Sequence, residues 1–343
     1  MSFLAVQSQA SIEKFYEIGG RLLAFQFSDE VAARVAREFI EGMYFTPIDA
    51  PATRAARFVH CTVNIFQGDP PPLPPGCQTF EVPRGLCHTK GDEHFLDIDE
   101  SRIAVSTATS RLVSVWLGAT AHARHPVAIV NTLSYAVQAA LRRGGLYVLH
   151  AAGVVEPVTG TGMIVVGNSN SGKSSLTIRL AGAGWRYLSD DMLVLAEENG
   201  MAEAWALRRI FSVSSSSLAN SGLTALGDAL GAPVNSDPSK RKLEPRISFP
   251  GSFVESCRPR VLLFPTLTGE ASSRIEKLSS GEAMAQLIRQ CPWASYDAST
   301  AREHLRVLGL MAKQSISYKL YAGLDLLEDS TRAPQLLASC LEQ

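Results

Sequence analysis

The stretch that decides the fold runs from Gly162 to Leu195 and reads GMIVVGNSNSGKSSLTIRLAGAGWRYLSDDMLVL. Within it, Gly167–Ser174 satisfies G-x-x-x-x-G-K-[ST], the pattern of a phosphate-binding loop. The apolar run MIVVG before the motif predicts a strand, and KSSLTIRLAGAG predicts a helix after it. Backbone amides of such a loop surround phosphate oxygens, and the helix adds unpaired N–H groups and its positive dipole end. We therefore predict a nucleotide-binding loop.

Two side chains of the motif have predicted roles of their own. The Lys173 ammonium neutralises β- and γ-phosphate charge, and the Ser174 hydroxyl ligates magnesium. The alternative is that these residues merely open a helix after a glycine-rich turn, but the strand before them and the helix after them favour nucleotide binding. We expect ATP or GTP with Mg²⁺ as cofactors, held by Gly167, Asn168, Ser169, Asn170, Ser171, Gly172, Lys173, Ser174 and Ser175.

Two adjacent carboxylates follow the predicted helix. Gly184 ends the helix, and WRYLSDDMLVLAE reads as one strand that carries Asp190 and Asp191 between apolar halves. Because burial and an adjacent like charge both raise a carboxyl pKa, such a pair is expected to bind a cation or to transfer protons. A surface turn capped by two aspartates is the alternative. The position directly after the phosphate loop favours the functional interpretation.

The residues from Leu149 to Leu195 resemble the HPr kinase/phosphorylase-like family of P-loop serine kinases. The family pattern is a histidine shortly before the loop, then G-x-S-x-x-G-K-S, a short helix, a glycine, and a strand with two aspartates. The matching residues are His150, Ser169, Lys173, Ser174, Gly184, Asp190 and Asp191. The resemblance implies an α/β fold with a P-loop kinase core of the HPr kinase/phosphoenolpyruvate carboxykinase-like type.

The resemblance also implies a catalytic set. Asp190 is expected to be the base that accepts the proton of a serine hydroxyl, with Asp191 and His150 beside it and Lys173 on the phosphates. Phosphoryl transfer needs positioning, charge neutralisation and a proton acceptor, so the chemistry agrees. Ser174 and Asp191 are the expected magnesium ligands. Taken alone, His150 fits an ordinary strand histidine equally well, although histidine can also orient a carboxylate or move protons near neutral pH.

The sequence departs from the family pattern in two places. Asn170 replaces a residue that is usually glycine, which is tolerable because asparagine enters left-handed backbone conformations more readily than most residues. The family's downstream glycine-rich signature, which helps to recognise HPr, has no counterpart. LRRIFSVSSSS and SKRKLEPR stand in its place. This difference disfavours HPr as the acceptor and also disfavours the reverse phosphorolysis reaction.

Those two replacement segments carry five basic residues. A loose transition state needs cations beyond the loop lysine, so these residues are candidates for phosphate or substrate contacts. Solvated surface charge is the alternative for each of them. The five are Arg208, Arg209, Lys240, Arg241 and Lys242.

Three functions remain open at this stage. The leading hypothesis is a nucleotide-dependent serine kinase whose acceptor is a peptide or protein other than HPr, since members of the broader family resemble kinases of ribosomal precursor peptides, including lasso peptides. A kinase of free serine or of another small hydroxyl compound is the nearest alternative. A sensor or ATPase would bind nucleotide through Gly167, Lys173 and Ser174 without needing a hydroxyl-directed Asp190.

The length of 343 residues predicts two domains. Residues 1–125 are expected to form an N-terminal α+β domain that binds the acceptor or makes oligomers, with a helix after Ser28 and antiparallel strands between Thr79 and Trp116. Residues 126–343 are expected to form the catalytic domain, beginning with a helix over Val127–Arg143 and ending in helices. The proline-rich Asp69–Gly76 is interpreted as a rigid loop, with partner binding as the alternative.

The charge balance excludes several classes of protein. With 32 basic and 33 acidic residues, the chain lacks the broad positive field of nucleic-acid-binding and membrane-surface proteins. It has no run of eighteen apolar residues and no secretory signal, so we expect a cytoplasmic protein. The six cysteines never form a C-x-x-C pair, which favours free thiols over disulfides or structural zinc. A homo-oligomer is consistent with related catalytic cores.

Overall fold

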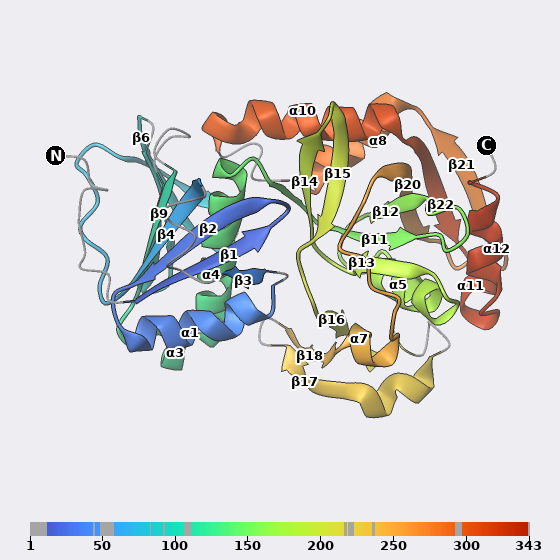
Figure 1. The fold of residues 1–343 in the computed structure, drawn as a ribbon, viewed down its shortest axis with the longest axis horizontal. Helices are drawn as coiled ribbons and strands as arrows, with labels where there is room; N and C mark the ends of the chain where they lie inside the picture. The colour runs from blue at the N-terminus through green and yellow to red at the C-terminus, as the bar shows by residue number, and fades with distance from the viewer. Residues whose placement is uncertain are drawn as a thin grey trace. The chain divides into compact units, whose positions relative to one another are not determined.

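The computed structural model describes residues 12–43, 45–48, 58–82, 84–91, 93–105, 111–215, 218, 223–234, 237–291 and 297–341. Within them the chain is a mixed α/β protein with four sheets, and it separates into two compact units, residues 1–146 and 147–343 (Figure 1). The division lies after the helix α4 (Pro126–Arg143), whereas the sequence pattern placed it before this helix. The helix belongs to unit 1 because it packs against strands of that unit's sheet.

Unit 1 is built on a nine-stranded sheet in the order β3-β1-β2-β4-β9-β8-β7-β6-β5. β2 pairs parallel with β4, and β4 with β9, while the other neighbours are antiparallel. The antiparallel strands predicted between Thr79 and Trp116 are confirmed as β5 to β9. The bounds are β1 Ile12–Ile18, β2 Arg21–Phe27, β3 Thr46–Ile48, β4 Val59–Gln67, β5 Gln78–Val82, β6 Gly85–Lys90, β7 Glu93–Ile98, β8 Ser101–Val105 and β9 Leu112–Leu117.

The predicted helices of unit 1 are confirmed. α1 (Glu30–Glu41) begins at Asp29, whose carboxylate accepts hydrogen bonds from the backbone N–H groups of Val31 and Ala32, and this cap satisfies two otherwise unpaired donors. The short α3 (Ala121–Arg124) leads into α4, which ends before Gly144. Gly145 then adopts φ +78°, the left-handed conformation that glycine enters without steric cost.

The proline-rich segment of unit 1 contains no helix or strand between Asp69 and Cys77. The carbonyl of Pro71 accepts a hydrogen bond from Nη1 of Arg102 at 2.6 Å, and Arg102 is itself held in a two-bond ion pair by Asp97. A buried guanidinium thus ties the segment to the sheet, which agrees with the rigid-loop interpretation. Partner binding stays a prediction.

Unit 2 contains three sheets. Their orders are β13-β11-β12-β20-β22-β21, β10-β14-β15-β19 and β16-β18-β17. The strand bounds are β10 Tyr147–Leu149, β11 Ala151–Val155, β12 Gly162–Val166, β13 Arg186–Ser189, β14 Leu193–Glu198, β15 Met201–Ala206, β16 Phe211–Val213, β17 Leu230–Val234, β18 Asp237–Leu243, β19 Ser256–Cys257, β20 Pro259–Leu267, β21 Arg274–Leu278 and β22 Ile316–Ala322. The helix bounds are α5 Lys173–Gly182, η2 Thr224–Ala229, α7 Pro245–Ser248, α8 Ser280–Arg289, α10 Ala298–Gln314, α11 Asp325–Glu328 and α12 Arg332–Ala338.

The six-stranded sheet forms the centre of unit 2 because its middle strands are apolar on both faces. Every residue of β11 and β12 is buried, and β12 runs parallel to β20, which runs parallel to β22. α5 packs against β11 and β13, and α12 packs against α5 (Figure 1). The predicted strands before and helix after the phosphate-loop motif are confirmed, as are the late helices α8 and α10.

Two apolar segments are each divided in the structure. LYVLHAAGVV forms β10 and β11, and WRYLSDDMLVLAE forms β13 and β14. The prediction of one strand over WRYLSDDMLVLAE was wrong because the segment leaves one sheet and enters another, and neither its length nor its apolar pattern records that change of partner. Polar residues lie at both divisions: His150 in the first, and Asp190 and Asp191 beside the apolar Met192 in the second.

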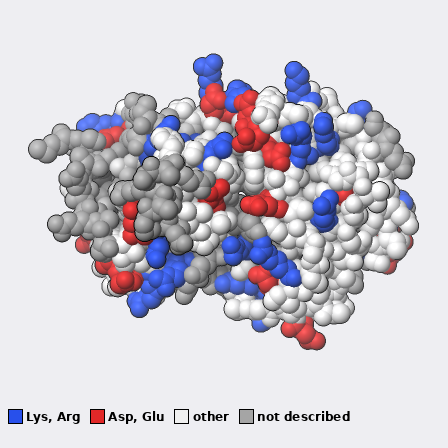
Figure 2. Space-filling model, in the orientation of Figure 1, with Lys and Arg blue, Asp and Glu red and all other residues white. Residues whose placement is uncertain are grey.

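The surface carries both signs of charge. Figure 2 shows basic and acidic side chains interspersed on the face that it draws, rather than one broad field of either sign. None of the described helices is long and apolar enough to cross a membrane. All six cysteines are free thiols.

Candidate functional site

The Gly167–Ser174 loop joins the carboxyl end of β12 to the amino end of α5. Two of its residues have left-handed backbones, Asn170 at φ +64° and Gly172 at φ +94°. The expected tolerance of asparagine at position 170 is therefore confirmed. A Cβ at Gly172 would lie 3.3 Å from Cδ2 of Leu267, so glycine meets both a conformational and a steric requirement. These turns place the loop over the first N–H groups of α5.

Lys173 lies across its own loop. The side chain is 6% exposed, and Nζ donates hydrogen bonds to the carbonyl oxygens of Gly167 at 2.7 Å and Asn168 at 2.9 Å. Burial lowers the pKa of Lys173, and the nearby carboxylates of Asp191 and Asp190 oppose that effect. The ammonium group is thus held within the loop by carbonyl dipoles, where an incoming phosphate could replace them.

The acidic pair and His150 meet because two neighbouring strands change sheets at the same level. β10 pairs with β14 through Leu149 and Leu193, and β11 pairs with β13 through Gly153 and Ser189. The junctions β10–β11 and β13–β14 therefore lie side by side. His150 is the single residue of the first junction, so the structure brings it to the aspartates 40 positions later in the chain.

Asp191 is held by two partners, the His150 ring and the Arg208 guanidinium. His150 Nε2 lies 2.8 Å from Asp191 Oδ1, and Arg208 Nη1 lies 3.0 Å from Oδ2. Burial by itself raises the pKa of Asp191, but the Arg208 guanidinium and the His150 hydrogen bond outweigh it and hold the pKa well below its ordinary value. Asp191 is therefore ionised near neutral pH, and its side chain keeps 28% of its surface exposed.

Asp190 has the opposite environment. It is 1% exposed, and Oδ2 accepts a hydrogen bond from the Ser212 backbone N–H at 3.3 Å. Oδ1 is buried and has no hydrogen-bond partner among the described residues. Burial and the charge of Asp191 raise the pKa of Asp190 to about 7, with smaller opposing effects from Arg208, the Ser212 N–H and a hydrogen bond from Ser174. The pair thus combines one permanent anion with one carboxyl group that titrates near neutrality.

The structure separates the five predicted cations. Arg208 is at the site through Asp191, and the charge of Lys240 is close enough to lower the pKa of Lys173. Lys242 pairs across the sheet with Ser212 and shares a face of β18 with Lys240, because side chains alternate along a strand. Arg241 lies on the opposite face, where Nε donates to the Gly231 carbonyl at 2.6 Å.

Arg209 follows Arg208 directly and is half-buried. Its predicted substrate contact stays a prediction.

Sequence reasoning missed two contacts of the site. Ser212 contributes a backbone N–H, which any residue but proline could supply, so its identity gives no signal. Gln290, at the end of α8, donates a hydrogen bond from Nε2 to Oδ1 of Asn168 at 2.8 Å, and nothing in the helical pattern of AMAQLIRQC marks that residue.

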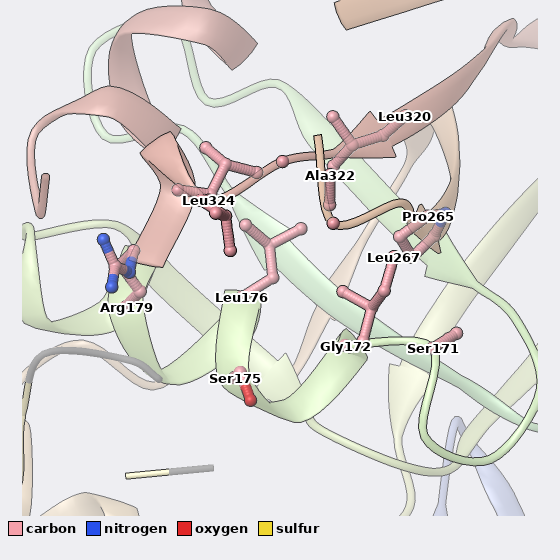
Figure 3. A pocket seen from close by; sticks show the side chains of 13 residues that line it. Ser171, Gly172, Ser175, Leu176, Arg179, Pro265, Leu267, Leu320, Ala322 and Leu324 are labelled. Atoms are coloured by element: carbon pink, nitrogen blue, oxygen red, sulfur yellow. The ribbon is translucent and has the colours of Figure 1, made fainter. Parts of the chain in front are cut away.

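An apolar cavity of about 230 Å³ beside the loop was also missed. It is lined by Ser171 and Leu176 on one side and by the ends of β20 and β22 on the other (Figure 3). The strand ends that form it have the composition of ordinary core strands, so the sequence carries no signal for it.

Comparisons with known proteins add little to this geometry. No protein-family model matches the chain, and no curated protein matches it. Among solved structures, the HPr(Ser) kinase/phosphatase from Coxiella burnetii is similar to it with 14% sequence identity and a TM-score of 0.29, over 56% of this chain and 94% of that chain. A likeness at this level carries no conclusion about activity or substrate, so the assignments below are argued from the site itself.

The opposite environments of the two aspartates predict opposite effects of pH on stability. Asp190 has an ordinary pKa of 3.8 when unfolded and about 7 when folded, so the folded protein loses stability as pH rises through this window. Asp190→Asn removes that loss. We therefore expect the difference between its melting temperature and that of the unmodified protein to increase by at least about 3 °C from pH 4.5 to pH 7.5. Both proteins are measured without nucleotide and with a chelator.

Asp191→Asn is the matched control. The folded pKa of Asp191 is lowered, so its stabilising contribution is present above the unfolded value and is lost only as pH falls below it. This variant should be less stable than the unmodified protein throughout pH 4.5–7.5. Its relative gain as pH rises should be smaller than that of Asp190→Asn, because burial, the larger cause of the raised Asp190 pKa, remains. A parallel pH response of the two variants would contradict the assigned environments.

Proposed function

We propose that this protein is a nucleotide-dependent phosphotransferase that moves the γ-phosphate of ATP or GTP to the serine hydroxyl of a peptide or protein other than HPr, such as a ribosomal precursor peptide. One observation carries the proposal. The adjacent β10–β11 and β13–β14 junctions, where both segments change sheets, bring a carboxyl pair to the loop that holds Lys173 and Ser174. A phosphate-binding motif and a proton acceptor therefore share one site.

The loop supplies the phosphate-binding part of the reaction. Its backbone amides and the amino end of α5 attract phosphate oxygens. Lys173 exchanges the carbonyls of Gly167 and Asn168 for phosphate oxygens and neutralises their charge. Lys240 and Lys242, on the same face of β18, add positive charge on this side of the site.

The residues present fit a magnesium ion of the kind that accompanies nucleotides. Mg²⁺ is usually bound by one or two carboxylates together with substrate phosphates, and Ser174 and the ionised Asp191 provide an oxygen ligand and a carboxylate. The described residues contain no group of three His, Cys, Asp or Glu side chains that could hold a metal by themselves. When bound, the ion neutralises charge on the phosphates. Asp191 also contacts Arg208, so its carboxylate would either bind both Arg208 and the ion or release Arg208.

Asp190 supplies the base. Its Oδ1 has no hydrogen-bond partner among the described residues, and its pKa of about 7 suits proton transfer at neutral pH. The acceptor hydroxyl gives its proton to Asp190 while its oxygen bonds to the γ-phosphorus. The bond between that phosphorus and the bridging oxygen breaks, and the nucleoside diphosphate leaves. His150 and Arg208 hold Asp191 in place and keep it ionised.

One observation favours a small acceptor as the second candidate. Asp190 is 1% exposed, so an acceptor must bring its hydroxyl to a nearly enclosed carboxyl group. Free serine or another small hydroxyl compound meets this requirement more easily than a folded protein does. A flexible peptide that presents a serine on an extended segment meets it as well. Acceptor binding or oligomerisation by unit 1 stays a prediction.

Lys173→Ala tests the phosphate-binding assignment. Loss of the ammonium removes the main side-chain countercharge of the loop, so we expect nucleotide-dependent phosphate release or transfer to fall at least about a hundredfold. Lys277→Ala, at an exposed lysine of β21, is the control and should retain the original rate. Both variants should show the circular dichroism spectrum of the unmodified protein. A folded Lys173→Ala protein with full activity would refute the phosphate-loop assignment.

Asp190→Asn separates the kinase from a nucleotide sensor. Asparagine keeps the shape and removes the basic carboxylate, so transfer should fall about a hundred- to ten-thousandfold. Nucleotide affinity in the presence of Mg²⁺ should stay unchanged or improve, because one negative charge near the triphosphate is gone. The transfer rate of His150→Ala should exceed that of Asp190→Asn by at least about tenfold, because a neighbour that only orients the carboxylate is partly replaceable. The assays are nucleotide titration and labelled-phosphate incorporation into candidate peptides and free serine.

Three outcomes of these assays count against the assignment. Normal transfer by Asp190→Asn removes Asp190 as the base. Loss of Mg²⁺ affinity in Asp190→Asn but not in Asp191→Asn exchanges the roles of the two aspartates. Nucleotide binding without transfer to any peptide or small hydroxyl compound supports the sensor.

A further inference from the structure

The apolar cavity lies at the carboxyl ends of the parallel strands of unit 2. β12, β20 and β22 run parallel, and the loop follows the first of them while the cavity is bounded by the ends of the other two. In open α/β sheets this edge is where ligands bind. The cavity shares Ser171 and Gly172 with the loop, so a ligand on the loop is continuous with it.

The volume of about 230 Å³ suits a flat ring system rather than a whole nucleotide. Pockets for drug-sized ligands occupy roughly 300–1,000 Å³. Leu176, Leu267 and Leu324 converge on the space from α5, β20 and the segment after β22, with Ala322 between them (Figure 3). Leu267 is 58% exposed and Leu324 is 43% exposed, which is unusual for leucines whose side chains face one another across a hollow.

The polar side chains around the cavity are directed elsewhere. Arg179 Nη1 donates to the backbone carbonyl of Asp329 at 2.7 Å, and the hydroxyl of Ser175 points away from the leucines (Figure 3). Ser171 Oγ lies within the loop, 2.6 Å from the position that a Cβ on Gly167 would take. Arg179 and Ser175 are therefore not aimed into the cavity, whereas Oγ of Ser171 is buried without a hydrogen-bond partner among the described residues.

Backbone donors at the cavity wall are also engaged. The N–H of Gly323 donates to Oγ of Ser273 at 2.8 Å, and the N–H of Leu324 donates to the carbonyl of Glu270 at 2.8 Å. A ligand edge thus cannot use these two N–H groups, but its own donors can meet backbone carbonyl oxygens. Both adenine and guanine carry an amino group that could donate to such an oxygen.

We propose that this cavity binds the purine base of the nucleotide whose phosphates lie on the Gly167–Ser174 loop, and that it holds the ring by apolar contact without reading its hydrogen-bonding edge. The proposal rests on the proposed nucleotide-binding function and adds the base specificity of the site. Strong discrimination between analogues needs buried polar groups that the wrong ligand leaves unpaired. The unpaired hydroxyl of Ser171 lies on the loop side, and the described leucine wall offers no polar side chain. ATP and GTP should therefore bind with affinities within about tenfold of each other.

The test compares ATP, GTP and inorganic triphosphate by calorimetric titration of the full chain in the presence of Mg²⁺. In the unmodified protein, both nucleotides should bind at least about tenfold more tightly than triphosphate, because only they bury a ring against apolar surface. Ala322→Phe fills the cavity and should reduce the affinities of ATP and GTP to that of triphosphate. The affinity of triphosphate should change less than about threefold.

A milder variant covers the case in which Ala322→Phe fails to fold. Leu324→Asn replaces a partly exposed leucine of the cavity wall with a neutral polar residue and should weaken ATP and GTP about three- to tenfold, with little effect on triphosphate. Leu305→Asn is the matched control, a 37% exposed leucine of α10 that does not line the cavity, and it should leave all three affinities unchanged.

Different results would overturn different parts of this argument. Equal affinity for triphosphate and both nucleotides, or undiminished nucleotide affinity in Leu324→Asn, refutes the base site and leaves the loop assignment standing. A preference above about a hundredfold for ATP over GTP, or for GTP over ATP, refutes the claim that the cavity does not recognise the hydrogen-bonding edge of the base. Failure of all three ligands to bind the unmodified protein refutes the proposed function itself.

Discussion

The change of sheet by two adjacent strand pairs is the constraint on which the candidate site depends. A strand that leaves one sheet for another interrupts its ladder of hydrogen bonds, and the residues at the interruption must satisfy their polar groups in other ways. At the β13–β14 junction, the buried Asp190 and the half-buried Asp191 occupy this position, and Asp191 finds its partners in His150 of the neighbouring junction and Arg208 of the next segment. Without paired crossovers, these side chains would lie in unrelated parts of unit 2.

The two adjacent aspartates have opposite pKa shifts because their immediate surroundings differ. They are adjacent in sequence, yet Asp191 contacts Arg208 and His150 while Asp190 is fully buried beside the negative charge of its neighbour. Each charge reinforces the difference, because the ionised Asp191 makes ionisation of Asp190 more costly. Pairs of titratable groups whose pKa values are driven apart are typical of acid–base catalysis.

In the proposed function, the loop and the cavity divide the recognition of a nucleotide into two physical problems. The loop offers amides, a helix terminus and Lys173, which attract charge and are indifferent to the base. The cavity offers apolar surface, which attracts a ring and is indifferent to charge. Both lie at the same edge of the sheet because β12, β20 and β22 are parallel, so their carboxyl ends meet there.

The sequence by itself determined the elements whose causes are local. The strand, loop and helix around Lys173, the left-handed backbone of Asn170 and the capped helix after Asp29 follow from residues within a few positions of each other. The resemblance of the motif also selected the residues of the candidate site. Only the tertiary structure decided that the two long apolar segments divide between sheets, that Asp191 rather than Asp190 receives His150, and that two strand ends enclose a cavity. These features depend on which strands pair across tens of residues, and a strand's apolar pattern records that it is buried but not against which partner.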